Sequence, residues 1–148
     1  MKLLPCALLL LLPSLPAAQE KDEWRRVVKY EDGTVIELNA SRVTFGLGQI
    51  GRVRLRVTWA RPRTMKEAPG GTYKTHLETV EFKCAERRFR RDEITLLDAD
   101  GKSIYSYEGE ETGEWEAVKP KTMMYKIIDP ACALIEEKRR TPDEEPRP

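Results

Sequence analysis

Long apolar runs are scarce in this sequence, and the one prominent run lies close to its start. It follows Lys2 and gives way to small residues and then to the polar Gln19. A short basic start, an apolar core and small residues are typical of a cleaved secretory signal, which we place at residues 1–18. Because no later run is long enough for a membrane helix, we expect an exported protein that does not span a membrane.

Cysteine and histidine are also rare, and this excludes several kinds of site. Cys6 lies inside the apolar core of the signal rather than near its cleavage site, so we expect its removal rather than its lipidation. The two cysteines that remain, with the single His76, cannot fill a typical zinc shell. A hydrolytic triad needs a histidine near a nucleophile, and His76 has none nearby in the sequence. We therefore expect no catalytic residue, no metal site and no cofactor.

Cys84 and Cys132 are the pair that would reach an oxidising compartment, where two cysteines most simply form one disulfide. Closing a loop of this size stabilises a fold by roughly 4 kcal/mol in the chain-entropy model. The chain after the signal has the length of one ordinary domain, which we place at residues 19–140. Residues 141–148 are almost entirely proline and charged residues, which predicts a disordered tail.

The charges are unevenly distributed along the chain. Residues 42–91 carry a net charge of +9, whereas residues 92–148 carry a net charge of −7. Two interpretations remain open. Either the two halves face each other or simply keep both faces of a sheet solvated, or the basic half forms a surface that binds a polyanion or an acidic partner protein. We expect no nucleic-acid partner.

Two Asp-Gly pairs predict hairpins between antiparallel strands. Asp32–Gly33 lies between the β-rich residues 24–30 and 35–38, and Asp100–Gly101 precedes the short β-rich stretch 103–107. Asp-Gly between such runs is a strong hairpin signal, because both residues tolerate positive φ. The second pair also resembles the start of a calcium loop, but the later acidic ligands of such a loop are missing. We therefore expect a hairpin at both places.

Residues 52–59, with the sequence RVRLRVTW, show the clearest alternation in the chain. One side of the expected strand carries the apolar residues Val53, Leu55, Val57 and Trp59. The other side carries Arg52, Arg54, Arg56 and Thr58. Alternation with period two predicts one buried and one wet face, as in an antiparallel sheet. The arginines are either a solvated face or, with Arg88, a partner-binding basic face.

The middle of the chain is expected to continue the sheet. Residues 61–71 contain prolines, glycines and charge without periodicity, which predicts a long loop. Residues 72–83 resume strand character, and residues 85–97 continue it. One face of this region is predicted to hold Val80, Phe82 and Cys84. We expect His76 to be an exposed or hydrogen-bonded bystander, and Trp115 to be an apolar anchor at the edge of the core.

The C-terminal residues 122–140 have the pattern of one helix face. Apolar residues recur there at intervals of three and four: Met123, Met124, Ile127, Ile128, Ala131, Leu134 and Ile135. Pro130 predicts either a kink or the first turn of a second helical segment. Cys132 would fasten this helix to the strand that holds Cys84.

Residues 84–90, with the sequence CAERRFR, are similar to a Cys-x-x-arginine-aromatic-arginine segment of the bacterial surface-adhesin protein E family. Trp115, Pro120 and Cys132 are similar to the tryptophan, proline and helix-borne cysteine of that family. The likeness runs from about Trp24 to Lys138. It implies an α+β fold, in which an antiparallel sheet of about six strands carries a C-terminal helix that is packed on it and tied to it by one disulfide.

The resemblance also implies exposure at a bacterial surface, and for the founding member the binding of host matrix proteins such as vitronectin and laminin. We expect localisation in the periplasm, at the outer-membrane surface or outside the cell. The first hypothesis is an exported binding module, an adhesin for host matrix proteins or polyanions, and not an enzyme. The alternative is a structural or assembly component of the cell envelope without a host ligand, which could self-associate through a sheet edge. The basic loop at residues 61–71 and Pro130 depart from the family pattern.

Overall fold

The computed structural model describes residues 21–65, 71–108 and 113–141. The signal expected at residues 1–18 and residues 142–148 of the expected tail lie outside these ranges. In chain order the elements are β1 (Trp24–Lys29), β2 (Val35–Asn39), β3 (Thr44–Phe45), the 3-10 turn η1 (Leu47–Gln49), β4 (Gly51–Thr64), β5 (Thr72–Lys83), β6 (Arg88–Leu97), β7 (Ser103–Glu108), β8 (Glu116–Ala117) and α1 (Met123–Arg140).

The strands form one antiparallel sheet with the order β1-β2-β4-β5-β6-β7. Two short strands pair beside this path, β3 with β4 and β8 with β6. The α+β architecture, the antiparallel sheet of about six strands and the C-terminal helix are thus confirmed. Within the described ranges, no helix has the length and apolarity that a membrane span requires.

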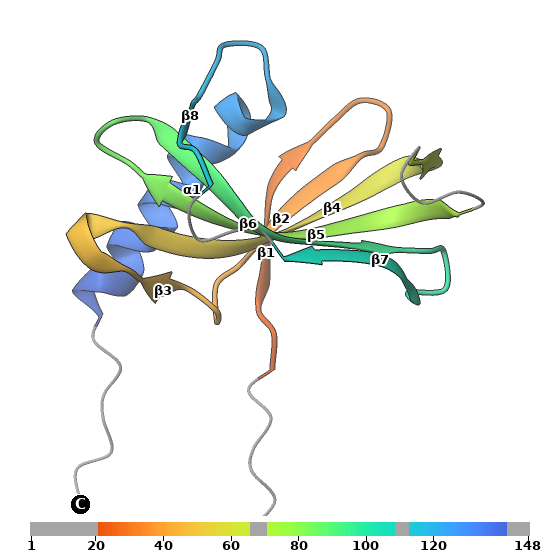
Figure 1. The fold of residues 1–148 in the computed structure, drawn as a ribbon, viewed down its shortest axis with the longest axis horizontal. Coiled ribbons are helices and arrows are strands. Elements are labelled where there is room, and N and C mark those ends of the chain that lie inside the picture. Colours follow the sequence, from red (N-terminus) through yellow and green to blue (C-terminus); the bar gives the residue numbers. More distant parts are fainter. Residues whose placement is uncertain (1–20, 66–70, 109–112, 142–148) are drawn as a thin grey trace, which may run out of the picture.

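The core lies between the sheet and α1. Figure 1 shows α1 lying across one end of the sheet, near β3, while the β1–β2 turn and the far end of β4 reach away from it. The predicted apolar residues of β4, Val53, Leu55 and Val57, are fully buried. They belong to one cluster with the buried helix residues, which are Met124, Ile127, Ile128, Ala131, Leu134 and Ile135. Burial of these side chains is the main stabilising contribution to the fold.

Both Asp-Gly pairs form the predicted hairpin turns. Gly33 and Gly101 have φ values of 95° and 82°, a backbone conformation that glycine adopts without strain. The first turn connects β1 to β2, and the second connects β6 to β7. In the second turn, Asp98 Oδ1 accepts hydrogen bonds from the backbone N–H groups of Asp100 and Lys102, at 2.9 and 2.8 Å.

Two sequence predictions were wrong in detail. Arg61–Thr64 were expected in a loop but continue β4, where Arg63 pairs with Tyr73 and Thr64 with Thr72 of β5. The ladder shifts register between Thr58 and Arg63, so Pro62, which has no N–H to donate, lies at the irregularity. Residues 85–97 were expected to extend a single strand region. A turn interrupts them, because Arg87 has a φ of 51° and β6 begins only at Arg88.

The helix α1 agrees closely with the predicted residues 122–140. Thr122 caps it, with its Oγ1 accepting the backbone N–H of Tyr125 at 3.3 Å. Pro130 lies inside one continuous helix, so a second helical segment does not begin there. Cys132 on α1 forms a disulfide with Cys84, and their Cα atoms are 5.8 Å apart. The predicted disulfide is confirmed, but it ties the helix to the β5–β6 turn and not to a strand, because β5 ends at Lys83.

Candidate functional site

The face of the sheet that points away from α1 is the candidate binding surface. Because the apolar residues of β4 face the core, the alternate residues Arg52, Arg54 and Arg56 lie on the opposite side. Residues that pair across antiparallel strands share a face, so Glu37, Glu81, Arg88 and Arg90 lie on this side as well. We call this set of charged residues the polar face.

Arg56 is paired at the side of the polar face near β2. Its Nε and Nη2 atoms lie 2.8 and 2.7 Å from Glu37 Oε2. The guanidinium carbon of Arg56 also lies 4.3 Å from the centre of the Trp24 ring, which is a cation–π contact. The positive charge of Arg56 is therefore largely compensated by its neighbours.

Glu81 of β5 joins two arginines on neighbouring strands. Its Oε1 lies 2.9 Å from Arg52 Nη2, and its Oε2 accepts Arg90 Nε at 2.7 Å. Burial alone would raise the pKa of Glu81, but the hydrogen bonds from Arg90 and Arg52 outweigh it and lower the pKa below its ordinary value. Arg52 also lies 3.2 Å from Asp92. The expected basic file is thus partly neutralised by carboxylates on adjacent strands.

Arg54 lies between these two paired positions and is in a different situation. The residue opposite it on β5 is Thr79, which cannot neutralise a guanidinium. Within the described residues Arg54 has no hydrogen bond at its buried Nε atom. The pKa of Asp22 is lowered mainly by the hydrogen bond from Asn39 and also by the ion pair with Arg42. The positive charge of Arg54 contributes a smaller part of this decrease. Arg54 is therefore the cation at the centre of the polar face with the least local compensation.

Arg88 is exposed at the start of β6 and donates from Nη2 to the backbone oxygen of Trp115 at 2.9 Å. The ring of Trp115 lies 4.5 Å from Lys83 Nζ and 4.9 Å from the guanidinium carbon of Arg90. Trp115 was expected at the edge of the core, and that expectation was wrong. The cations of β5 and β6 hold its ring on the polar face.

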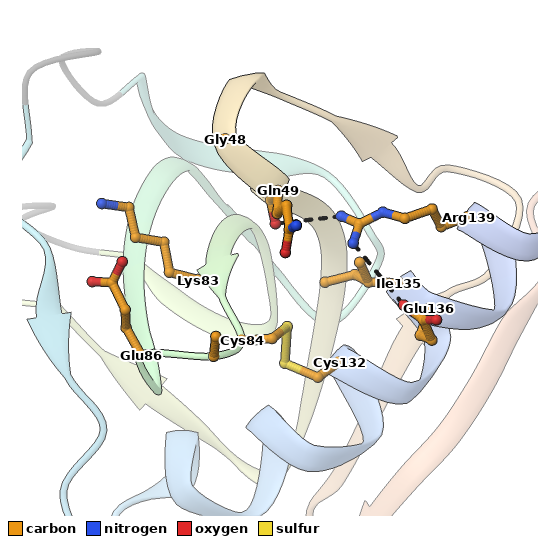
Figure 2. Close-up of a pocket in the computed structure, with 10 residues that line it drawn as sticks. Gly48, Gln49, Lys83, Cys84, Glu86, Cys132, Ile135, Glu136 and Arg139 are labelled. Carbon is orange, nitrogen blue, oxygen red and sulfur yellow. Dashed lines mark hydrogen bonds and ion pairs between the residues drawn. A yellow bond between two sulfur atoms is a disulfide. The ribbon is translucent and has the colours of Figure 1, made fainter.

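A pocket of about 380 Å³ opens beside the disulfide, between η1, the β5–β6 turn and α1. Figure 2 shows Lys83 and Glu86 on one side of it and Arg139 on the other, with the Cys84–Cys132 bridge at its base. Arg139 is held in place, because its Nη2 donates to the backbone oxygen of Gln49 at 3.3 Å and its Nη1 lies 4.0 Å from Glu136. The charges that line this pocket are of both signs, so it does not favour an anion or a cation.

A buried ionic group on β5 was missed by the sequence reasoning. Glu78 is buried with its side chain 0% exposed, opposite Leu55 on the core side of the sheet. Its Oε2 lies 3.4 Å from His76 Nε2, and its Oε1 lies 2.5 Å from Arg91 Nε, although the Arg91 N–H is not aligned for a regular hydrogen bond. Burial raises the pKa of Glu78, and the charge of Arg91 offsets part of this effect.

His76 was expected to be an exposed or hydrogen-bonded bystander, but its side chain is largely buried, and within the described residues its buried Nε2 has no hydrogen-bond partner. Burial, together with the positive charge of Arg91, lowers the pKa of His76 to about 4. The sequence contained a signal for this buried group. Alternate residues of a strand share one face, so residues 76, 78, 80 and 82 of β5 lie on the same side. Neither His76 nor Glu78 lines the disulfide pocket. In the described part of the chain, no group of three or more His, Cys, Asp or Glu side chains could hold a metal ion.

Comparison with known proteins identifies the family. The model of the family described as surface-adhesin protein E matches residues 21–133. A search among curated proteins gives no match. Among solved structures, crystal form II of Haemophilus influenzae protein E is 12% identical, with a TM-score of 0.55 over 84% of this chain and 98% of that one. A structure of protein E from non-typeable Haemophilus influenzae is 13% identical, with a TM-score of 0.53 over 86% of each chain.

At this level of identity the structural likeness shows a common fold, in which a sheet carries a C-terminal helix. The family match covers most of the chain and includes the residues that form the sheet, the disulfide and the first half of α1. This chain therefore belongs to the surface-adhesin protein E family.

Proposed function

We propose that this protein is an exported binding module that recognises an acidic segment of a host matrix protein, or a comparable polyanion, through the polar face. Membership of a surface-adhesin family supports the adhesive role and the exported location. The observation that carries the choice of surface is the position of Arg54. It lies centrally on a helix-free face, between arginines that carboxylates already pair.

The physical argument concerns which cations are available to a partner. Arg52, Arg56 and Arg90 are held by Glu37 and Glu81, so a ligand carboxylate would have to displace an existing ion pair to reach them. Arg54 has no such carboxylate opposite it on β5, so an incoming carboxylate or sulfate that reaches its guanidinium would gain a charge-assisted hydrogen bond with little to displace. Trp24 and Trp115 flank this position and offer ring surface to the rest of a ligand.

The test compares two arginine variants in a binding assay. The purified protein is applied to surfaces coated with a matrix protein, with heparin as a soluble polyanion competitor, at low and at high salt. We expect binding at low salt that weakens steeply as salt is added. Arg54→Gln should weaken it about tenfold, the scale of one charge-assisted hydrogen bond.

Arg140→Gln is the matched control, because it removes the same charge from an exposed position on α1, in the other layer of the molecule. It should leave binding unchanged. Absence of binding to both matrix protein and heparin at low salt would remove the basis of the proposal. Equal losses in the two variants would show that net charge, and not the polar face, determines binding.

One observation favours the alternative of a structural or assembly role. The outer strands of the sheet are β1 and β7. Charged side chains protect β1, which carries Arg25, Arg26 and Lys29, but β7 has the sequence SIYSYE and no basic residue. A second copy of the chain could extend the sheet at β7. Sedimentation tests this alternative, since a strict monomer at high protein concentration argues against it.

A further inference from the structure

A second pocket, of about 430 Å³, lies at the end of the sheet away from β3. The β1–β2 turn contributes Asp32 and Thr34 to its wall, and β4 contributes Trp59, Arg61 and Arg63. We call it the tip pocket. Trp59 packs against the core cluster, so the pocket lies on the side of the sheet opposite the polar face. Its volume is in the range of small-ligand sites.

The wall of the tip pocket is held together by hydrogen bonds between neighbouring strands. The backbone N–H of Ala60 donates to Thr34 Oγ1 at 3.2 Å, which joins β4 to the β1–β2 turn. Lys74 of β5 donates from Nζ to the backbone oxygen of Ala60 at 2.6 Å. These bonds fix the walls and place a third positive charge beside the two arginines.

The single carboxylate in the wall is already engaged within its own turn. Asp32 Oδ1 accepts the backbone N–H of Thr34 at 2.8 Å, and Asp32 Oδ2 accepts Thr34 Oγ1 at 3.1 Å. The backbone hydrogen bond, and more weakly the charges of Arg63 and Arg61, lower the pKa of Asp32. Both oxygens of Asp32 therefore accept hydrogen bonds within the turn. Its single negative charge only partly offsets the positive charges of the two arginines.

The two arginines are exposed, and Asp32, the carboxylate of the pocket wall, interacts with both only through a weak long-range charge effect. The guanidinium carbon of Arg63 lies 3.8 Å from the centre of the Trp59 ring, and stacking on an aromatic face limits the rotation of a long side chain. A guanidinium that is already oriented loses less entropy when it binds an oxyanion. The indole Nε1 of Trp59 is a buried donor without an acceptor in the described structure, so the ring that Arg63 stacks on is itself enclosed by its surroundings.

We infer that the tip pocket binds the oxyanion group of an acidic saccharide, with a sulfate or carboxylate held by Arg61 and Arg63 and the sugar ring in the remaining volume. A planar guanidinium fork matches both anions. A pocket of about 430 Å³ has room for more than the anion alone. This site is separate from the polar face and does not depend on the proposed function.

The three tryptophans provide the experiment with its own controls. Each should give one indole N–H signal in a proton–nitrogen NMR spectrum, and comparison with Trp59→Phe would assign the signal that belongs to the tip pocket. The full protein is titrated with inorganic sulfate, with a sulfated heparin disaccharide and with the same disaccharide lacking sulfate, at constant ionic strength balanced by chloride. Trp24 and Trp115 report on the polar face in the same spectra.

We expect the Trp59 signal to shift saturably with inorganic sulfate and with the sulfated disaccharide, and not with the unsulfated one. The sulfated disaccharide should bind at least about tenfold more tightly than inorganic sulfate, because the pocket also contacts the ring. Replacing both arginines, Arg61→Gln with Arg63→Gln, should weaken the binding of either probe about tenfold or more. Arg140→Gln should leave it unchanged.

A Trp59 signal that does not move, or that moves linearly together with the other two, overturns the inference. Equal affinity for inorganic sulfate and the sulfated disaccharide overturns the assignment to a saccharide. Shifts confined to Trp24 and Trp115 would support binding at the polar face and reject the tip pocket. The two proposals therefore fail independently. Both arginines are exposed, and a circular dichroism spectrum confirms that the double variant is folded.

Discussion

Among single residues, His76 should make the protein sensitive to acid, and its buried neighbour Glu78 should respond to pH in the opposite sense. Both lie on the core side of β5, and Arg91 is the cation that contacts Glu78. Arg91 also lies 3.2 Å from Glu116 on β8, so its charge is shared with a more exposed carboxylate. Removing one partner of such a buried group leaves an uncompensated charge and is strongly destabilising, although the intact group itself contributes little.

The lowered pKa of His76 predicts a loss of stability in mild acid. Its pKa falls from 6.5 to about 4 on folding, so the neutral form is favoured in the folded state. Above pH 6.5 His76 is neutral in both states and the free energy of unfolding is at its full value. As the pH falls toward 4, His76 binds a proton in the unfolded chain but not in the folded one, so the free energy of unfolding decreases. By pH 4 the loss should reach roughly 3 kcal/mol.

Urea unfolding of the wild type and of His76→Gln, at a series of pH values, measures this effect. The stability of the wild type relative to the variant should decrease as the pH falls from 7 to 4. Glu78 acts in the opposite direction, because its pKa is raised and its burial as an anion destabilises the fold at neutral pH. Glu78 is present in both the wild type and the variant, so the difference between their free energies of unfolding reports on His76. Parallel curves would contradict a buried neutral His76.

At the scale of elements, the packing of α1 on β4 depends on a glycine. A Cβ atom added to Gly51, at the start of β4, would overlap the side chain of Ile135 on the helix. Glycine therefore permits a closer approach of helix and strand than any other residue would. This contact lies at the same end of the sheet as the disulfide pocket, which Ile135 also lines.

We predict that Gly51→Ala destabilises the protein by about 1–3 kcal/mol, the usual range for an added methyl group in a well-packed core. The control is Gly46→Ala, because a Cβ at Gly46 would come no closer than 3.5 Å to its neighbour Ile50. That variant should be close to neutral. Thermal or urea unfolding of both variants is the measurement, and equal stabilities would show that the helix moves away without a penalty.

The sequence specified most of these elements, and the exceptions have physical causes. The strand at residues 52–59, the two Asp-Gly hairpins and the helix after Thr122 each follow from local patterns. The β5–β6 turn escaped prediction because residues 84–87 contain no glycine, proline or asparagine, and Arg87 adopts a left-handed conformation under tertiary constraint. The continuation of β4 through Arg61–Thr64 was hidden by Pro62, which predicts a loop unless a strand partner tolerates it.

For the whole molecule, the disulfide and the ion pairs between distant segments join the basic and acidic parts of the chain. Arg52 with Asp92, Arg87 with Asp129 and Arg91 with Glu116 each connect residues 42–91 to residues 92–148. Part of the charge segregation seen in the sequence is thus resolved by folding. Exposed ion pairs of this kind contribute little stability each, so we assign the larger share of the long-range tie to the disulfide.

The bond between Cys84 and Cys132 closes a separation of 48 residues, for which the chain-entropy model gives roughly 4 kcal/mol. We therefore predict that the free energy of unfolding falls by about this amount when dithiothreitol reduces the disulfide. The double variant Cys84→Ser with Cys132→Ser should show the same loss without reductant. Urea unfolding in both conditions is the measurement. Unchanged stability would mean that the helix holds its place by packing alone.

The sequence by itself determined the alternation that separates Arg52, Arg54 and Arg56 from the core, the cysteine pair and the helix face, because these depend on periods of two and 3.6 residues within one segment. Only the tertiary structure decided which of these arginines has no carboxylate opposite it across the ladders that β4 forms with β2 and β5. Strand register sets Glu37 against Arg56, Glu81 against Arg52 and Thr79 against Arg54. It depends on turns and bulges that join distant residues, so local periodicity does not encode it.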